Sequence, residues 1–496
     1  MTAATKTLVR YEPIIGLEVH VQLQTRSKMF CACPNDYAGA EPNTHVCPVC
    51  MGMPGVLPVI NRRAVDFTIM TGLALNCTIP PYAKFDRKNY PYPDLMKGYQ
   101  ISQYDAPLCI NGWLEIGEPG QERRVGITRV HLEEDTATLK HETGPHGETY
   151  SLVDVNRSGA PLMEIVGEPD LRSPEEARQY LMKLRQILRY IGVSRANMEE
   201  GNLRCDANIS LRPLGSTTFG SKVEIKNMNS FRAVYRALEY EIERQAALLD
   251  RGERVARETR GWVESEGRTV SQRSKEEAND YRYFPEPDLP PLAISRERVK
   301  ALRAALPELP DARRRRFIAE YDLPPYDAAL LTDSRERADW FEQAVTAAKA
   351  ALPGRDGVAK AVANWVLGDF VRLQNAANVE LDAVKVTPQG LAELVALVET
   401  GQITGKAAKS VLEQAFATGR SPAAIMREAG LTSISDATAI EEAVRRVLAA
   451  NEKAVADYRR GKTNAIQALV GQVMKETRGR ARPDVVRETL ERLLAE

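Results

Sequence analysis

The stretch Ile14–Gln24, with the sequence IIGLEVHVQLQ, alternates between apolar and polar residues from Leu17 onward. A period of two is typical of a β-strand that has one face on a core and one face open. On the open face Glu18 and His20 are neighbours, about 7 Å apart by the rise of a strand. A carboxylate and an imidazole at that distance can share a metal ion or a proton, although a plain solvated strand face would show the same pattern. The stretch predicts a strand, and the role of its polar face depends on the rest of the chain.

The chain has 496 residues, enough for about three domains. Its 67 Lys plus Arg equal its 67 Asp plus Glu, so no overall positive field indicates a nucleic-acid partner, and local patches would have to hold one. We find no signal-peptide pattern and no run of the roughly 18 apolar residues that a membrane crossing needs. We therefore expect a cytoplasmic protein with no membrane partner and with its seven cysteines reduced.

Four cysteines form two close pairs, a CxC at residues 31–33 and a CxxC at residues 47–50, on either side of a loop rich in Pro, Asn and Gly. This arrangement is typical of a structural zinc knuckle, in which the metal folds a loop that burial alone could not fold. The alternatives are four free thiols, or His45 in place of one ligand. The predicted Zn²⁺ ligands are Cys31, Cys33, Cys47 and Cys50. A closed site of four thiolates has no open coordination position, so we expect it to be structural.

The segment Lys84–Gln100 interleaves basic residues with Tyr and Pro. Such a non-helical stretch is typical of a loop that grips phosphates and stacks bases, although an ordinary surface loop is the alternative. The sequence contains no complete Walker loop and no GxGxxG after a strand. A nucleotide would therefore be bound through carboxylate-held metal and basic side chains.

Three consecutive acids, Glu133, Glu134 and Asp135, lie in the strand-like segment Gly126–Leu139. Such a cluster is costly unless a cation lies among the acids. Alternation places Glu133 and Asp135 on one face together with His131, and it places Glu134 on the other. A bulge would reverse this, so the pattern alone does not choose between Glu133 and Glu134 as a ligand.

Further predicted strands carry polar faces of the same kind. Glu164 is a carboxylate between apolar neighbours, and a charge there needs a partner. The segment Leu203–Leu211 alternates, with Arg204 and Asp206 on its polar face, and Lys222–Asn227 is expected to join it as a hairpin. Stacked as one antiparallel sheet, these strands would form a charged concave floor over an apolar underside, which suits metal-dependent phosphate chemistry.

Helices are predicted from Ser173 to Gly192, with a serine cap, and again after Asn229 or Ser230. From about residue 295 the composition changes to Ala, Arg, Leu and Glu with helical spacing. The fold class is therefore α+β. The predicted domains are a catalytic domain at 1–294, a helical linker domain at 295–354 and a helical tail domain at 355–496.

The segment Asn464–Lys475 has the apolar stripe of one amphipathic helix. Basic residues around it suggest an RNA contact, although a solvated helix with charged ends would look the same. These residues are Arg459, Arg460, Lys462, Lys475, Arg478, Arg480 and Arg482.

Seven motifs taken together are distinctive. They are GLEVH at 16–20, KFDRKNY at 84–90, YQISQ at 99–103, HLEED at 131–135, and the stretches 154–169, 198–210 and 280–288. Through them the chain closely resembles, over essentially its whole length, the B-subunit family of the tRNA-dependent aspartyl/glutamyl-tRNA amidotransferase.

The resemblance implies a glutamine-synthetase-like antiparallel cradle domain, a helical domain and a tail that grips tRNA. It implies a glutamine-hydrolysing carbon–nitrogen ligase acting on mischarged Glu-tRNA(Gln) or Asp-tRNA(Asn). ATP, with Mg²⁺, phosphorylates the aminoacyl carboxylate, and ammonia then displaces phosphate. The implied partners are tRNA, an amidase (glutaminase) subunit that supplies ammonia, a small third subunit and the non-discriminating aminoacyl-tRNA synthetase. The paired cysteines match the zinc knuckle that many members of the family keep.

The resemblance also assigns roles to individual residues. It implies that Mg²⁺ is held by His20, Glu134 and Glu164, with Glu18 and Lys88 in the same site. It thus favours Glu134, which the alternation did not. The residues expected to contact the nucleotide are Lys84, Arg87, Arg204 and Asp206.

Two other functions compete with this interpretation. A non-catalytic tRNA-binding scaffold is disfavoured, because it has no use for clustered acids on strands. A stand-alone ligase for small molecules is disfavoured by the long helical tail. Which of the two mischarged tRNAs is converted is not readable from the sequence.

Overall fold

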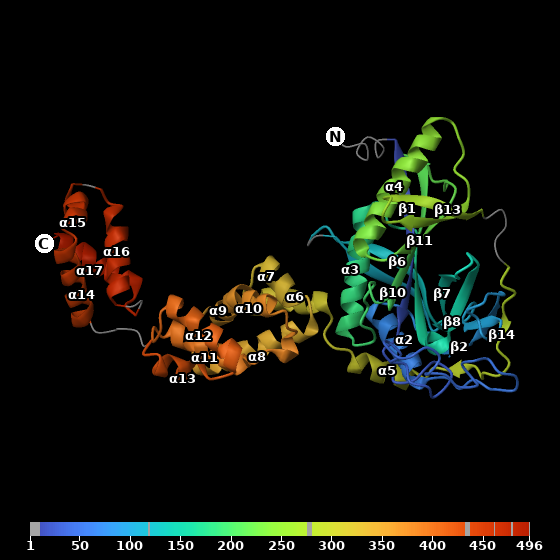
Figure 1. Ribbon diagram of the computed structural model, residues 1–496, viewed down its shortest axis with the longest axis horizontal. Helices are drawn as coiled ribbons and strands as arrows, with labels where there is room; N and C mark the ends of the chain where they lie inside the picture. Colours follow the sequence, from blue (N-terminus) through green and yellow to red (C-terminus); the bar gives the residue numbers. More distant parts are fainter. Residues whose placement is uncertain are drawn as a thin grey trace. The chain divides into compact units, whose positions relative to one another are not determined.

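The computed structural model describes residues 10–117, 120–274, 280–431, 437–460, 462–477 and 480–495. The chain forms two compact units that meet in sequence at Leu309 and Pro310. The first unit carries the β-sheet and the second is helical (Figure 1). The predicted α+β class is confirmed.

The first unit is built on an eight-stranded sheet with the order β13-β12-β11-β10-β1-β9-β6-β5. Its strands are β1 (Tyr11–Gln22), β5 (Cys109–Ile116), β6 (Arg123–Glu134), β9 (Pro161–Gly167), β10 (Leu203–Pro213), β11 (Val223–Met228), β12 (Glu258–Val263) and β13 (Arg268–Ser274). Neighbouring strands are antiparallel except β11 and β12, which are parallel. The predicted hairpin of β10 and β11 is confirmed.

The predicted alternation of β1 holds in the structure. Its odd-numbered apolar residues from Ile15 to Val21 are buried, and so is Leu23 beyond its end, whereas His20 and Gln22 are partly open. The apolar face joins a single core with helices α2 (Arg62–Ala74), α3 (Pro174–Tyr190) and α4 (Phe231–Asp250). One face of β1 is therefore fixed by burial, which leaves the other face for polar side chains.

The two long helices begin where the sequence predicts. Ser173 Oγ accepts a hydrogen bond from Glu176 N (3.1 Å), and Pro174 occupies the first turn of α3. Ser230 Oγ accepts from Ala233 N (3.0 Å) and caps α4, which settles the choice between Asn229 and Ser230.

Three small sheets complete the first unit. They are β3 (Asp86–Asn89) with β4 (Tyr99–Ser102) and β14 (Phe284–Pro285), β2 (Tyr82–Ala83) with β15 (Leu292–Ala293), and β7 (Thr138–Thr143) with β8 (Thr149–Asp154). The segment Lys84–Gln100, expected to be a loop, contains β3 and the start of β4, because β3 pairs with β4 and with the distant β14. The turn η1 (Val155–Arg157) links β8 to β9, as the strand–turn–strand pattern predicts.

The remaining helices follow in sequence order. They are α5 (Arg296–Ala305), α6 (Pro310–Tyr321), α7 (Pro325–Leu331), α8 (Arg335–Ala351), α9 (Val358–Trp365), η2 (Val366–Phe370), α10 (Val371–Ala377), η3 (Leu381–Ala383), α11 (Pro388–Glu399), α12 (Gly405–Thr418), α13 (Pro422–Glu428), α14 (Ala437–Ala450), α15 (Glu452–Arg459), α16 (Ala465–Glu476) and α17 (Pro483–Ala495). None of the helices in the described ranges combines the length and apolar character that crossing a membrane requires.

The helical unit has two separate apolar cores, one from Phe317 to Met426 and one from Ile440 to Leu494. Helix α5 packs through Val299 and Leu302 against the core of the sheet-bearing unit. The three-domain division at residues 294 and 354 stays a prediction.

We expect Leu17→Ala to destabilise the sheet-bearing unit by about 2–5 kcal/mol, because it empties a fully packed position beneath β1. Chemical denaturation of the purified chain measures the change. The control Met182→Ala removes a side chain that is 46% exposed on α3 and should change stability by less than about 0.5 kcal/mol. Equal effects of the two substitutions would contradict the assigned core.

Candidate active site and thiolate cluster

Strand register places a row of ionisable side chains across the polar face of the large sheet. His20 on β1 lies opposite Arg204 on β10 and Glu164 on β9, and Glu164 lies opposite His131 on β6. Residues directly opposite each other on one face of a sheet have Cβ atoms about 5 Å apart. Four strands distant in sequence thus bring two imidazoles, a carboxylate and a guanidinium together.

Glu133 joins the centre of this row. His20 Nε2 lies 3.4 Å from a Glu164 oxygen and 3.8 Å from a Glu133 oxygen. His131 Nε2 lies 3.3 Å from Glu164 and 3.7 Å from Glu133. Both carboxylates and His131 are buried, and His20 is partly open. His131 was part of a predicted motif but received no role from the sequence, and its position opposite Glu164 is what reveals it.

The close acids and imidazoles change each other's pKa. Although burial acts to lower it, the pKa of His20 rises to about 9 because Glu164 and Glu133 lie beside it. Burial acts to raise the pKa of Glu164, but His131 and His20 hold it well below its usual value. His20, Glu133 and Glu164 each offer a ligand atom, and these atoms lie within 4.8 Å of one another. These ligand atoms are close enough to surround one cation, which would displace the proton that the two carboxylates hold on His20.

Glu134 lies on the opposite face of β6 from this cluster. Its carboxylate binds Lys97 Nζ (2.6 Å) and accepts a hydrogen bond from Ile101 N (3.0 Å). The alternation argument is confirmed, since His131, Glu133 and Asp135 share one face. The structure brings Glu133, and not Glu134, to His20 and Glu164.

The charged floor continues toward β10 and β11. Glu18 accepts a hydrogen bond from Asn208 Nδ2 (2.9 Å), and Asp206 pairs with Lys226 (2.6 Å). Arg204 pairs with Asp135 (2.8 Å), whose second partner is Gln22. Two of the residues expected at the nucleotide, Arg204 and Asp206, are thus on the same face as the cluster.

Lys88 on β3 is close enough to Glu133 and Glu164 to interact with both carboxylates electrostatically. Burial acts to lower its pKa, but Glu133 and Glu164 are among the groups that hold it above its usual value, so the ammonium stays charged. Its Nζ lies 5.1 Å from the centre of the Tyr281 ring and 5.9 Å from that of Tyr90. Tyr281 belongs to a motif quoted from the sequence, but only the fold places it beside Lys88.

Lys84 and Arg87 are engaged with acids outside the cluster. Lys84 pairs with Asp86 and Asp105. Arg87 forms a two-pronged pair with Glu286 (2.7 and 2.8 Å), and its guanidinium lies over the Tyr99 ring. Their expected contact with the nucleotide stays a prediction.

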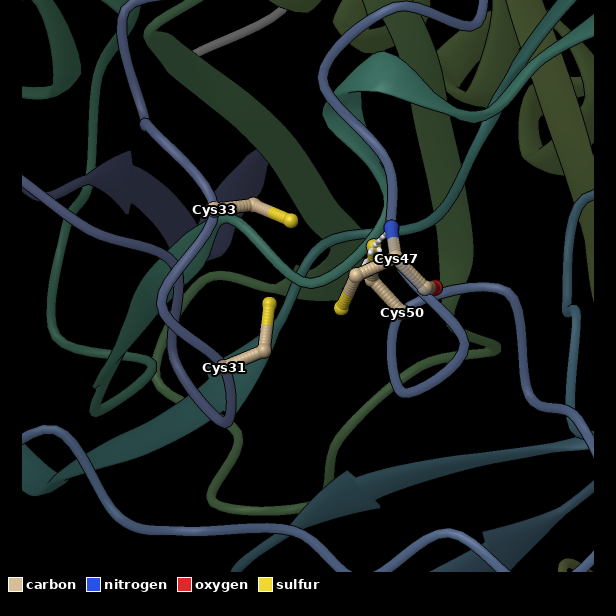
Figure 2. Close-up of side chains that lie close together, drawn as sticks. All are labelled: Cys31, Cys33, Cys47 and Cys50. Carbon is tan, nitrogen blue, oxygen red and sulfur yellow. Dashed lines mark hydrogen bonds between the residues drawn. The ribbon is translucent and has the colours of Figure 1, made fainter.

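The four predicted zinc ligands converge in the loop between β1 and α2, and Figure 2 shows their sulfur atoms turned toward one another. All four Sγ atoms lie within 4.8 Å of one another. Ligands at about 2.3 Å from a tetrahedral ion lie about 3.8 Å apart, so the cluster is compatible with zinc. His45 is not a member of the cluster found among the described residues. A hydrogen bond with Cys31 is the main reason that the pKa of Cys50 falls to about 4.

The fold and these two clusters define a two-part protein with a strand-borne polar site and a helical carboxyl-terminal region. Residues 13–300 match the GatB/GatE catalytic domain family, and residues 339–494 match the GatB domain family. The chain belongs to the family of aspartyl/glutamyl-tRNA(Asn/Gln) amidotransferase B subunits, so the resemblance found in the sequence is confirmed.

Full-length relatives carry that name. The chain is 58% identical over 491 residues to the B subunit from Dehalococcoides mccartyi strain CBDB1, covering 99% of this chain and 100% of the relative. It is 57% identical over 486 residues to that of Moorella thermoacetica, covering 98% and 100%. It is also 57% identical over 486 residues to that of Thermomicrobium roseum, covering 98% and 99%.

We expect Asp135→Asn to cost about 1–3 kcal/mol of stability at neutral pH, because it removes the charge of a buried carboxylate that pairs with Arg204 and accepts a hydrogen bond from Gln22. Burial acts to raise the pKa of Asp135, but Arg204 and Arg157 hold it below its usual value. A lowered folded-state pKa contributes stability above the unfolded value of about 3.9, and this contribution is lost as the pH falls through the folded value. Denaturation at a series of pH values should therefore show wild type and variant converging below about pH 4. A constant difference at all pH values would contradict the charge-based account.

Proposed function

We propose that the cluster of His20, Glu133 and Glu164 is the site at which this chain activates the side-chain carboxylate of a mischarged tRNA. The chain is a subunit of an amidotransferase, a carbon–nitrogen ligase that transamidates misacylated Glu-tRNA or Asp-tRNA. The observation that carries the proposal is the convergence of two buried carboxylates and an imidazole from three strands.

A carboxylate is a poor electrophile, so the amidation needs a leaving group on its oxygen. We propose that ATP supplies it by phosphorylation and that ammonia then displaces phosphate. His20, Glu133 and Glu164 would hold Mg²⁺, which neutralises phosphate oxygens when bound. Two carboxylates suit a hard cation, and the rigid strands fix their spacing. This set takes Glu133 where the resemblance took Glu134.

The chain's own cations complete the proposed site. Lys88 keeps its charge beside Glu133 and Glu164, so its ammonium can bind the transferred phosphoryl group and stabilise the charge that develops on it. Glu18, on the same strand face as His20, would orient the ligands or accept protons from the incoming amine. Arg204 and Asp206 lie opposite His20 and Glu18 on β10, so they would be available to a nucleotide bound beside the cluster.

The relatives are named as B subunits, which indicates an enzyme of several subunits. We propose that a glutaminase subunit supplies the ammonia and that a small third subunit joins the complex. The sequence supports this division of labour, because it contains no GxSxG nucleophile motif. The four cysteines would hold a structural Zn²⁺. The partner synthetase inferred from the resemblance also stays a proposal.

We expect Glu133→Gln and Glu164→Gln to reduce ATP-dependent transamidation by about 10- to 100-fold or more in the assembled complex, while glutamine hydrolysis continues. The assay follows ADP release as a function of Mg²⁺ concentration, with mischarged Glu-tRNA and Asp-tRNA offered separately.

Glu134→Gln is the matched control, with the same chemical change at the next residue. It breaks the pair with Lys97 and should lower stability without changing the Mg²⁺ concentration for half-maximal activity. A changed Mg²⁺ requirement in Glu134→Gln, with Glu133→Gln normal, would restore the ligand set that the resemblance implied.

The last four helices are proposed to contact tRNA. They share a core of their own that begins at Ile440, and the predicted amphipathic helix is α16 (Ala465–Glu476). Arg459, Arg460, Lys462, Lys475 and Arg482 are exposed, Arg480 is partly exposed, and Arg478 lies outside the described residues. A basic surface on an independently packed bundle supports phosphate binding.

Removal of all residues after Leu431 should weaken tRNA binding and flatten its salt dependence, because fewer phosphate contacts release fewer counterions. Filter binding at several salt concentrations measures both effects. Unchanged affinity and salt slope would exclude the tail from the tRNA interface. Unchanged folding of the sheet-bearing unit, seen by circular dichroism, serves as the control.

A further inference from the structure

Lys28, in the loop after β1, is a fully buried lysine with no carboxylate partner among the ion pairs of the described residues. Its Nζ lies 3.4 Å from the carbonyl oxygen of Val155, a weak contact for an ammonium group. Lys84 and Lys97, in the same unit, are each paired with acids. Burying an unpaired charge is costly, so Lys28 needs an anion other than a carboxylate of the described residues.

The cysteine cluster next to Lys28 is a source of such negative charge. Lys28 N donates a hydrogen bond to Cys33 O (2.9 Å), which anchors it to the cysteine loop. A methyl group placed on Gly159 would lie 3.5 Å from Cys50 Cβ and 3.7 Å from Lys28 Cδ, so both side chains pack over that glycine.

Charge balance connects these observations. Four thiolates around Zn²⁺ leave a net charge of −2, and Cys50 contributes its share in a buried position. We propose that Lys28 is the built-in counter-charge of the tetrathiolate zinc site, so that the buried ammonium and the loaded metal site depend on each other. The inference rests on the zinc site proposed above.

This pairing has a structural role beyond the loop. Ser158 Oγ donates to Cys50 O (3.2 Å), and Gly159 N donates to Asp135 O (2.9 Å). The chain around Gly159 thus links the cysteine loop to the end of β6 and the start of β9, the strands that carry Glu133 and Glu164. Loss of zinc would upset the charge balance around Lys28 at this junction and loosen it.

The test compares Lys28→Met with Lys28→Arg and with Lys140→Met, which changes an exposed lysine on β7. Each variant is measured as the full-length chain in its complex. Competition with a chromogenic chelator should show zinc affinity lowered by about 10- to 100-fold in Lys28→Met, largely retained in Lys28→Arg and unchanged in Lys140→Met.

Thermal unfolding separates a charge role from a packing role. In the zinc-loaded protein Lys28→Met should lower the Tm, because the two negative charges of the site lose the cation that balances them. After chelation the difference in Tm between variant and wild type should shrink, because the metal-bound charge that Lys28 balances is then gone. A Tm lowered equally in both states, or an unchanged zinc affinity, would overturn the inference.

Wild-type protein gives an independent readout if Lys28→Met does not fold. Mass spectrometry after treatment with a lysine-acylating reagent should find Lys28 protected with zinc and modified after chelation. Protection in both states would overturn the inference. Metal analysis identifies which proposal fails: a wild type without zinc removes the zinc site and the inference together, whereas zinc present with no effect of Lys28 removes the inference alone.

Discussion

The Glu164 carboxylate, held between the imidazoles of His20 and His131, is the interaction on which the polar side of the sheet depends. Its neighbours in β9 are apolar and face a packed core, so the strand cannot move to expose the acid. A buried carboxylate persists only with partners of opposite charge or a cation. Strands β1 and β6, which supply those partners, therefore have to be aligned with β9, and their alignment creates the site.

The strands that carry the site are held rigid because their opposite faces are buried. Residues of β1, β6 and β9 that point away from the cluster belong to the same core as α3 and α4. Each acidic or imidazole side chain then has a backbone position fixed by apolar packing beneath it. Lys88 comes from the separate small sheet of β3, β4 and β14, so the cation and the acids are brought together by tertiary structure alone.

Local patterns in the sequence predicted much of this unit. Strict alternation located β1 and β10, and serine caps with 3.6-residue spacing located α3 and α4. Alternation also placed Glu133 on the face of His131, as the structure has it, whereas the family resemblance favoured Glu134 as the ligand. Two adjacent acids match a motif equally well, but only one of them can point to a given face.

The sequence alone could not predict contacts between residues that lie far apart along the chain. Arg87 looked available for phosphate, yet it is bound by Glu286, which is 199 positions away in sequence. No spacing rule connects the two, and the same holds for Arg204 with Asp135. The sequence also did not predict that Lys28 is buried without a carboxylate partner, because a lysine next to a cysteine loop is usually exposed to solvent.

Glu133 and Glu134 are adjacent on β6 but point to opposite faces of it, so the strand separates two polar environments. The Lys97–Glu134 pair lines a cavity of about 220 Å³ that Cys31 and Cys50 also border. Glu133 lies on the other face of the strand, in the cluster with His20 and Glu164. Inserting or deleting one residue between the bulge at Ile127–Arg129 and the end of the strand would exchange the two acids. The length of this part of β6 is therefore as tightly constrained as the identity of the acids on it. The turn at residues 144–148, between β7 and β8, is free of that constraint.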